Sequence, residues 1–148
     1  MIGIGEKLPA FSVVGVKPKF HSHEENGQSA FEPLTEASFP GKWKVIFFYP
    51  KDFTFVCPTE IAEFARLNSE FADSNGSLVD GLGVRSPEGV AYRVTVVVDP
   101  GNVVQHVYAT NLSVGRAPKD TLRVLDALQT DELCACGREV GGGTLKVA

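Results

Sequence analysis

The feature that most constrains this chain is an apolar segment that runs into a turn and then into an amphipathic helix. Residues 44–49, which read KVIFFY, are apolar almost without interruption, as expected for a strand covered on both faces. Pro50 ends this strand. Pro58 suits the first position of a helix, where its missing N–H needs no partner. Apolar residues then recur at helical spacing at Ile61, Phe64, Leu67 and Phe71. The sequence therefore predicts a strand, a short loop and a helix in this order.

Cys57 stands immediately before this predicted helix. The backbone N–H groups of a first helical turn have no partners inside the helix, so they stabilise a thiolate and lower the pKa of a cysteine placed there. Glu60, in the first turn, suits the positive end of the helix dipole. Position alone leaves two interpretations open: Cys57 is a nucleophile, or it is a small and inert core residue, as lone cysteines often are.

The spacing of Pro50, Thr54 and Cys57, which is Pro-x-x-x-Thr-x-x-Cys, favours the nucleophile. This spacing resembles the active-site signature of the peroxiredoxins. The longer run over residues 47–60, FFYPKDFTFVCPTE, is similar to the typical two-cysteine branch of that family, and most of all to its bacterial alkyl hydroperoxide reductase C type. The resemblance is specific because many positions match in one unbroken stretch.

The resemblance implies a thiol peroxidase that reduces hydrogen peroxide and alkyl hydroperoxides with no metal and no organic cofactor. Cys57 would be the peroxidatic cysteine, whose thiolate attacks one peroxide oxygen and becomes a sulfenic acid. Thr54 would hydrogen-bond the peroxide, and Pro50 would cover the thiolate. Without the resemblance, Thr54 would be read as the cap of a loop turn and Pro50 as a plain strand terminator.

Two charged residues complete the expected site. Arg93 resembles the catalytic arginine of the family, and a guanidinium suits this role because it stays charged and offers several fixed donors. Without the resemblance, a solvated charge at a strand end would be the simpler interpretation. Glu60 resembles the glutamate that orients this arginine. Arg116 matches the family less closely, and we leave it out of the catalytic set.

Cys134 and Cys136 lie in a polar, glycine-rich tail. A thiol in such a tail can travel to a sulfenic acid and form a disulfide with it. Cys134 resembles the resolving cysteine of the family, which usually belongs to the partner subunit of a dimer, and Cys136 resembles an extra tail cysteine of some bacterial members. The two together would supply only half of a four-ligand zinc site, so metal binding is the less favoured interpretation.

Beyond the strand–loop–helix unit, the pattern predicts further strands and helices and one long loop. They are a weak strand at 9–16, a long loop at 17–40 anchored by Phe31 and Phe39, a short helix at 77–84, paired strands at 93–99 and 103–108, and a helix at 118–130. This order suits an α/β sandwich with a mixed β-sheet, and it resembles the thioredoxin-like fold of the peroxiredoxins. We expect one domain over residues 1–148, in which 131–148 form a cysteine-bearing tail.

The middle of the chain is shorter than the family pattern. In peroxiredoxins the first helix is followed by a strand, a helix and another short strand, but here only residues 73–76 stand in that place. A crossover unit of that kind needs roughly 30 residues. Its loss should expose an edge of the strand at 44–49, which is a hazard for aggregation or for the exchange of elements between chains.

The composition limits which binding partners and which cellular compartment we expect for this chain. The net charge is −4, so the chain lacks the excess of basic residues that is typical of proteins that bind nucleic acid or an anionic membrane. The N-terminus has no signal-peptide pattern, and no apolar stretch approaches the length of a membrane span. Three cysteines make no secreted disulfide framework, so we expect a cytoplasmic protein whose cysteines are redox-active. The resemblance implies a separate disulfide reductase as electron donor and a homodimer or a ring of dimers.

Two other functions stay open. A general thiol–disulfide oxidoreductase would use Cys134 and Cys136, and its exchange activity would survive the loss of Cys57. A truncated and catalytically dead relative would act as an interaction module, with Arg93 misplaced and Cys57 of ordinary reactivity. The short middle of the chain is the reason why this last interpretation stays open.

Overall fold

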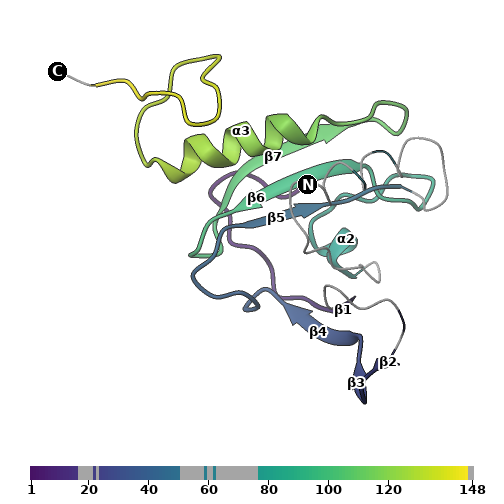
Figure 1. Ribbon diagram of the computed structural model, residues 1–148. Coiled ribbons are helices and arrows are strands. Elements are labelled where there is room, and N and C mark those ends of the chain that lie inside the picture. Colours follow the sequence, from purple (N-terminus) through teal and green to yellow (C-terminus); the bar gives the residue numbers. More distant parts are fainter. Residues whose placement is uncertain (17–21, 23, 51–58, 60–61, 63–76, 147–148) are drawn as a thin grey trace.

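A three-stranded antiparallel sheet is the centre of the computed structural model, which describes residues 1–16, 22, 24–50, 59, 62 and 77–146 (Figure 1). Its strands are β5 (Lys44–Phe47), β6 (Arg93–Val98) and β7 (Val104–Thr110), in the order β5–β6–β7. Every side chain of β6 is buried. Because β6 pairs on both sides and is covered on both faces, it is the central strand, as its valine-rich sequence predicts.

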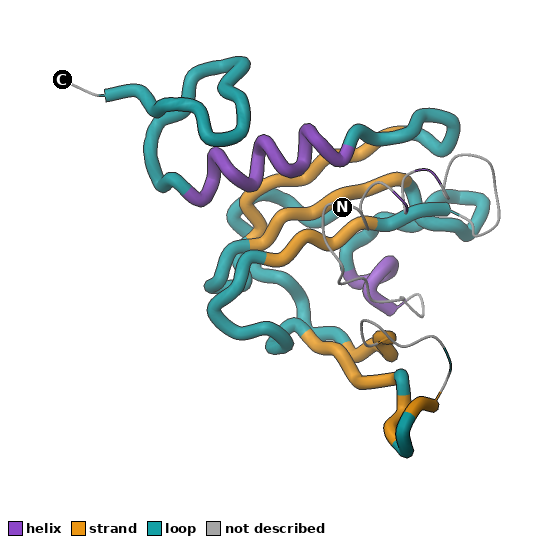
Figure 2. The backbone as a smooth tube through the Cα atoms, viewed as in Figure 1, coloured by secondary structure: helices purple, strands orange, loops and turns teal. Residues whose placement is uncertain are grey.

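Each face of the sheet is covered by one helix and the residues next to it. On one face, Val94, Val96 and Val98 pack with α2 (Ser77–Gly81), the residues that follow it and the N-terminal segment; this core contains Leu8, Val13, Phe48, Leu78, Val79, Leu82, Val84 and Val104. The other face carries the alternate residues of β6, and the chain that enters α3 (Pro118–Gln129) reaches Thr95 there. Figure 2 shows α2 and α3 on opposite sides of the three strands.

The N-terminal segment is tied to the core by its backbone. The Ile2 N–H donates to the Leu82 carbonyl at 2.9 Å, and the Gly5 N–H donates to the Val104 carbonyl at 2.8 Å. Gly83 follows α2 with a φ of +63°, and a Cβ there would lie 2.9 Å from the Met1 nitrogen. Only glycine fits both this backbone conformation and this close approach.

Residues 17–40 hold more structure than predicted. β1 (Ser12–Val16) pairs antiparallel with β4 (Phe31–Thr35), and β2 (Glu24–Glu25) pairs with β3 (Gln28–Ser29). The prediction of a continuous long loop was therefore wrong. The missed signal is Asn26-Gly27: both residues have positive φ, 52° and 72°, which a tight two-residue hairpin turn requires.

Other expected elements stand as predicted or with small changes. β1, α2, β6, β7 and α3 occupy the predicted segments, and β7 runs two residues further than expected. Phe31 and Phe39, which were expected to anchor this loop, are 42% and 39% exposed, so they are less covered than that role suggested. The side chains of β5 are only half-buried, so this strand is less covered than its apolar sequence suggested. All pairings between described strands are antiparallel.

Asp99 organises the turn that joins β6 to β7. Its carboxylate accepts hydrogen bonds from the Val103 N–H at 2.9 Å, the Gly101 N–H at 2.8 Å and the Gln105 amide at 2.7 Å. These donors, with the Val103 N–H the largest influence, hold the pKa of Asp99 below its ordinary value. Asn102, in the same turn, has a φ of +61°. The carboxylate therefore fixes the register of the hairpin.

We expect Asp99→Ala to lower the free energy of unfolding by about 1–3 kcal/mol at neutral pH, because three donors lose a charged acceptor. The wild-type advantage is present above the ordinary aspartate pKa of 3.8, and it is lost as pH falls through the lower folded-state pKa. Urea titrations at neutral pH and in acid measure it. Glu139→Ala, which removes an exposed tail carboxylate, is the control; equal losses in both variants would contradict this role of Asp99.

Candidate functional site

One end of the central sheet brings together Pro50 and the first residue of β6. The pairing of β5 with β6 continues past the last residue of β5, because the Phe48 N–H donates to the Val94 carbonyl at 2.7 Å. Pro50 follows two residues later and is half-buried. Arg93 precedes Val94, so it opens β6 at this same end. The structure thus places two residues of the expected site where the chain leaves the sheet toward the motif cysteine.

Arg93 is a buried cation. Its residue is only 3% exposed, and its Nε donates to the Leu112 carbonyl at 2.8 Å. The interpretation of Arg93 as a solvated charge at a strand end was therefore wrong. A buried guanidinium carries a large desolvation cost and offers donors in a fixed plane, which is the arrangement that suits binding of an anionic or polar oxygen.

A second guanidinium, that of Arg116, lies at this end of the sheet. Its Nη1 donates to the Val94 carbonyl at 2.7 Å and to the Thr95 hydroxyl at 3.1 Å, and the residue is 6% exposed. The guanidinium carbon lies 5.6 Å from the centre of the Phe47 ring. Sequence reasoning left Arg116 out. Its contacts show that it clamps β6 to the end of β5, so it positions the backbone around Arg93.

The other expected residues of this site, Thr54, Cys57 and Glu60, lie outside the described residues. Their roles therefore stay predictions. Thr59 and Ala62 are described, and both have helical backbone, in agreement with the helix expected after Cys57.

Cys134 lies just beyond the C-terminal end of α3 and is half-buried. Its sulfur has three oxygen neighbours: the Thr130 hydroxyl at 3.6 Å, the Glu132 carbonyl at 3.6 Å and the Ala127 carbonyl at 3.8 Å. The sulfur thus faces the end of its own helix. Cys136, two residues on, is exposed. Both are free thiols.

The tail cysteines and the arginines lie at opposite ends of the chain's own sheet. Arg116 contacts the β6 end two residues before α3 begins, and α3 then runs for 12 residues. A helix of that length spans about 18 Å. The tail that carries Cys134 follows the far end of α3, opposite the loop that leads into this helix (Figure 1). The geometry separates the expected resolving thiol from Pro50 and Arg93 within one chain.

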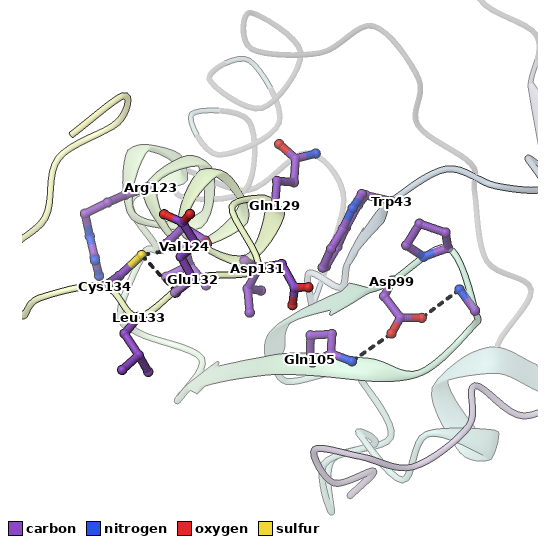
Figure 3. Close-up of a pocket in the computed structure, with 14 residues that line it drawn as sticks. Trp43, Asp99, Gln105, Arg123, Val124, Gln129, Asp131, Glu132, Leu133 and Cys134 are labelled. Atoms are coloured by element: carbon purple, nitrogen blue, oxygen red, sulfur yellow. Dashed lines mark hydrogen bonds between the residues drawn. The ribbon is translucent and has the colours of Figure 1, made fainter. Parts of the chain in front are cut away.

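An open hollow of about 770 Å³ lies beside Cys134 (Figure 3). Cys134 and Arg123 lie at one end, and Trp43 and Asp99 lie toward the other. The walls come from the C-terminal half of α3, the first tail residues and the β6–β7 turn. The hollow leaves the surroundings of the thiol accessible to solvent.

Metal and membrane interpretations gain no support from the described part of the chain. No group of three His, Cys, Asp or Glu side chains within it could hold a metal ion. No helix within it has both the length and the apolar character that crossing a bilayer requires.

The comparisons with known families, sequences and structures agree with one another. The sequence model of the AhpC/TSA family matches residues 4–79. Alkyl hydroperoxide reductase C of Mycobacterium tuberculosis is 39% identical over 183 aligned positions, which cover 98% of this chain and 94% of that protein. The solved structure of Mycobacterium tuberculosis AhpC superposes with a TM-score of 0.79 at 38% identity, covering 91% of this chain and 97% of that one. A 2-Cys peroxiredoxin of Plasmodium vivax superposes with a TM-score of 0.79 at 24% identity, covering 97% and 92%.

These likenesses define the fold as the thioredoxin-like fold of the peroxiredoxins. The chain belongs to the AhpC/TSA family. Its relatives include proteins named alkyl hydroperoxide reductase, peroxiredoxin and thioredoxin peroxidase, so it is an oxidoreductase of the thiol-dependent peroxidase class.

The alignment also confirms that the chain is shortened. Its 183 positions exceed the 148 residues of this chain by 35, so at least 35 positions of the mycobacterial relative have no counterpart here. Among the described strands, β5 is an edge of the three-stranded sheet, as the missing crossover unit predicts.

The different exposures of the tail cysteines predict different reactivity. We expect Cys136 to react several times faster than Cys134 with a bulky maleimide in the folded, reduced protein, because Cys134 faces the end of α3. Peptide mass mapping after timed labelling measures the two rates. In urea the rates should converge. A Cys134 that reacts as fast as Cys136 in the folded protein would show that its sulfur does not lie as described.

Proposed function

We propose that this chain reduces hydrogen peroxide and alkyl hydroperoxides, with Cys57 as the peroxidatic cysteine. The Cys57 thiolate attacks one peroxide oxygen, the O–O bond breaks, and water or an alcohol leaves while the sulfur becomes a sulfenic acid. The observation that carries this proposal is the buried Arg93 guanidinium at the sheet end from which the motif segment leaves. A fixed cation there stabilises both a thiolate and the charge that develops on the departing oxygen.

The neighbouring residues have supporting roles in this proposal. Pro50, half-buried beside Arg93, limits access of water to the sulfur. Thr54 directs its hydroxyl to the peroxide, and Glu60 orients the arginine. Arg116 acts through the backbone of β6 rather than on the peroxide.

The second half of the cycle uses a thiol of another chain. The Cys134 thiol attacks the sulfenic acid; an S–S bond forms, the S–O bond breaks, and the thiol proton leaves with the hydroxyl group as water. The separation of Cys134 from Arg93 along α3 supports a partner subunit as the source of this thiol. Cys136 is the second candidate for the same role, and its exposure makes it accessible.

A homodimer, alone or in a ring of dimers, fits the surface of this chain. Large apolar side chains are exposed on β7, in the loop before α3, on α3 and in the tail; they are Tyr108, Val114, Leu122, Leu133, Val140 and Leu145. Exposed apolar side chains that gather in one patch are typical of a protein interface, so we propose these residues as its members. The tail would then lie at the boundary between two chains.

The electron donor would be a separate disulfide reductase with a dithiol, in keeping with a relative from Trypanosoma brucei rhodesiense that is named thioredoxin peroxidase. The cysteines function in the reduced state, so we place the protein in the cytoplasm, where thiols are kept reduced. We treat residues 1–148 as one domain and 131–148 as its tail.

One equivalent of hydrogen peroxide, added to the fully reduced protein, should convert the wild type to a disulfide-linked dimer. Cys57→Ser should stay monomeric on intact mass analysis without reductant. Cys134→Ser should form the dimer more slowly, through Cys136. Unchanged thiols in the wild type over minutes would overturn the peroxidase proposal. Disulfide exchange that persists in Cys57→Ser would favour the general oxidoreductase instead.

Arg93→Gln should slow the reaction of Cys57 with peroxide roughly a hundredfold or more, the cost typical of losing a donor that stabilises developing charge. Arg93→Lys should recover only part of the rate, because an ammonium lacks the planar fork. Stopped-flow peroxide consumption measures it. The maleimide reactivity of Cys136 serves as the folding control. A wild-type rate in Arg93→Gln with an intact fold would remove Arg93 from the catalytic set.

A further inference from the structure

The strand β5 is paired on one side only within the described part of the chain. It is the outer strand of the order β5–β6–β7 (Figure 1). The Phe48 N–H donates to the Val94 carbonyl at 2.7 Å, so these two residues form a hydrogen-bonded pair of the ladder. Every second residue follows the same pattern, so Ile46 and Lys44 also direct their backbone groups toward β6. The N–H and C=O of Val45 are therefore directed at the open edge of the sheet.

The edge of β5 lacks the features that usually keep two sheet edges apart, which are an outward charge, a proline or a bulge. The one charge in β5 is Lys44, and its ammonium is turned back to its own chain: it donates to the Glu36 carbonyl at 2.7 Å and to the Asn102 side-chain oxygen at 2.5 Å. β5 contains no proline, and its pairing with β6 keeps one register from Lys44 to Phe47. This edge is regular and uncharged.

The side chains of β5 are also less covered than those of the neighbouring strand. All residues of β6 are buried, whereas those of β5 are half-buried, although its sequence after Lys44 is apolar. The alignment with the mycobacterial relative spans 183 positions against 148 residues here, and the loss of the crossover unit is expected to leave this edge open. The edge of β5 is therefore suited to a strand from another molecule.

The sequence around Val45 is complementary to itself in an antiparallel pairing. Trp43 stands two residues before Val45 and Phe47 stands two residues after it, and both are half-buried. A two-fold axis at Val45 places Trp43 of each copy opposite Phe47 of the other, and aromatic cross-strand pairs stabilise a sheet. A parallel pairing in the same register would instead place the two Lys44 residues beside each other. Side-chain pairing and charge thus both favour a second copy of this chain in antiparallel orientation.

We propose that β5 pairs antiparallel with β5 of a second copy, so that the two three-stranded sheets become one continuous sheet. The Val45 N–H donates to the Val45 carbonyl of the second copy, and the reverse bond closes the pair. This interface does not depend on peroxidase chemistry. It lies at the opposite edge of the sheet from β7, so it differs from the surface proposed above for the homodimer. Two different two-fold interfaces on one chain build an open row of subunits or close into a ring.

Hydrogen exchange of two adjacent amides tests the pairing without any substitution. The Val45 N–H points to the open edge and the Ile46 N–H points to β6, so only Val45 should gain protection when the fully reduced protein is concentrated. We expect the exchange of Val45 to slow at least tenfold from dilute to concentrated protein, while Ile46 exchanges slowly in both. Exchange detected by NMR resolves the two amides. Fast exchange of Val45 at every protein concentration would overturn the proposal.

A charge at the two-fold axis should separate the two copies. Val45→Lys places two like charges opposite each other, so the dissociation constant measured by sedimentation velocity should rise about tenfold or more. Val45→Thr keeps a β-branched side chain and should associate like the unsubstituted strand. Both are made in a Leu122→Lys background, which weakens the α3 surface proposed for the homodimer, and thermal unfolding reports whether each variant is folded. Equal dissociation constants for folded Val45→Lys and Val45→Thr would contradict the pairing.

A cross-link tests the geometry directly. Val45→Cys, in a background with Cys57, Cys134 and Cys136 all replaced by serine, carries a single thiol. Opposite residues of a hydrogen-bonded antiparallel pair have Cα atoms about 5.5 Å apart, within the range that a disulfide accepts, so mild oxidation should link two chains.

The matched control for the cross-link is Val14→Cys in the same background. Val14 is 56% exposed on β1, which does not belong to the three-stranded sheet, so this variant should stay monomeric. Cross-linking of Val45→Cys that is absent, or no faster than that of Val14→Cys, would overturn the proposal. Because no peroxide is used in any of these measurements, their failure would not bear on the proposed peroxidase activity.

Discussion

The structure depends on the burial of β6 between two strands and under two layers. A strand with every side chain buried tolerates a charge only if the surrounding structure compensates it, and β6 begins with Arg93. The Leu112 carbonyl binds this guanidinium, and Arg116 fastens the adjacent Val94 and Thr95. The fully buried strand therefore begins at a charged residue, and the chain leaves β5 for the motif segment at this same end of the sheet.

The sequence predicted the elements whose signals are local and strong. β6 is a run of valines, the following turn contains Pro100 and Gly101, and α3 begins with Pro118, so all three could be placed without a structure. The hairpin at 24–29 was not predicted because its strand residues are polar, as loop residues usually are. Asn26-Gly27, however, is a typical two-residue hairpin turn. The exposure of Phe31 and Phe39 could not be read from their type, because only tertiary packing decides which apolar side chains are covered.

The candidate site shows the same division between local and tertiary information. A contiguous motif predicted roles for Cys57, Thr54 and Pro50, and family likeness predicted a role for Arg93. The burial of Arg93 and the role of Arg116 depend on segments 19 or more residues apart in sequence, which the pattern of residues does not reveal. The shortened middle was predicted by comparison with the family's order of elements, and the alignment with the mycobacterial relative confirms that the chain is shorter.

The length of α3 has a consequence for how the enzyme works as a population of molecules. One chain holds its arginine end and its tail thiols about a helix length apart, so in the cycle proposed above the second thiol comes from a partner and turnover is a property of two chains. Dilution below the dimer dissociation constant would leave each chain able to be oxidised once and unable to proceed. In the proposed cycle, the association of two chains would then govern the order of the reaction in protein concentration.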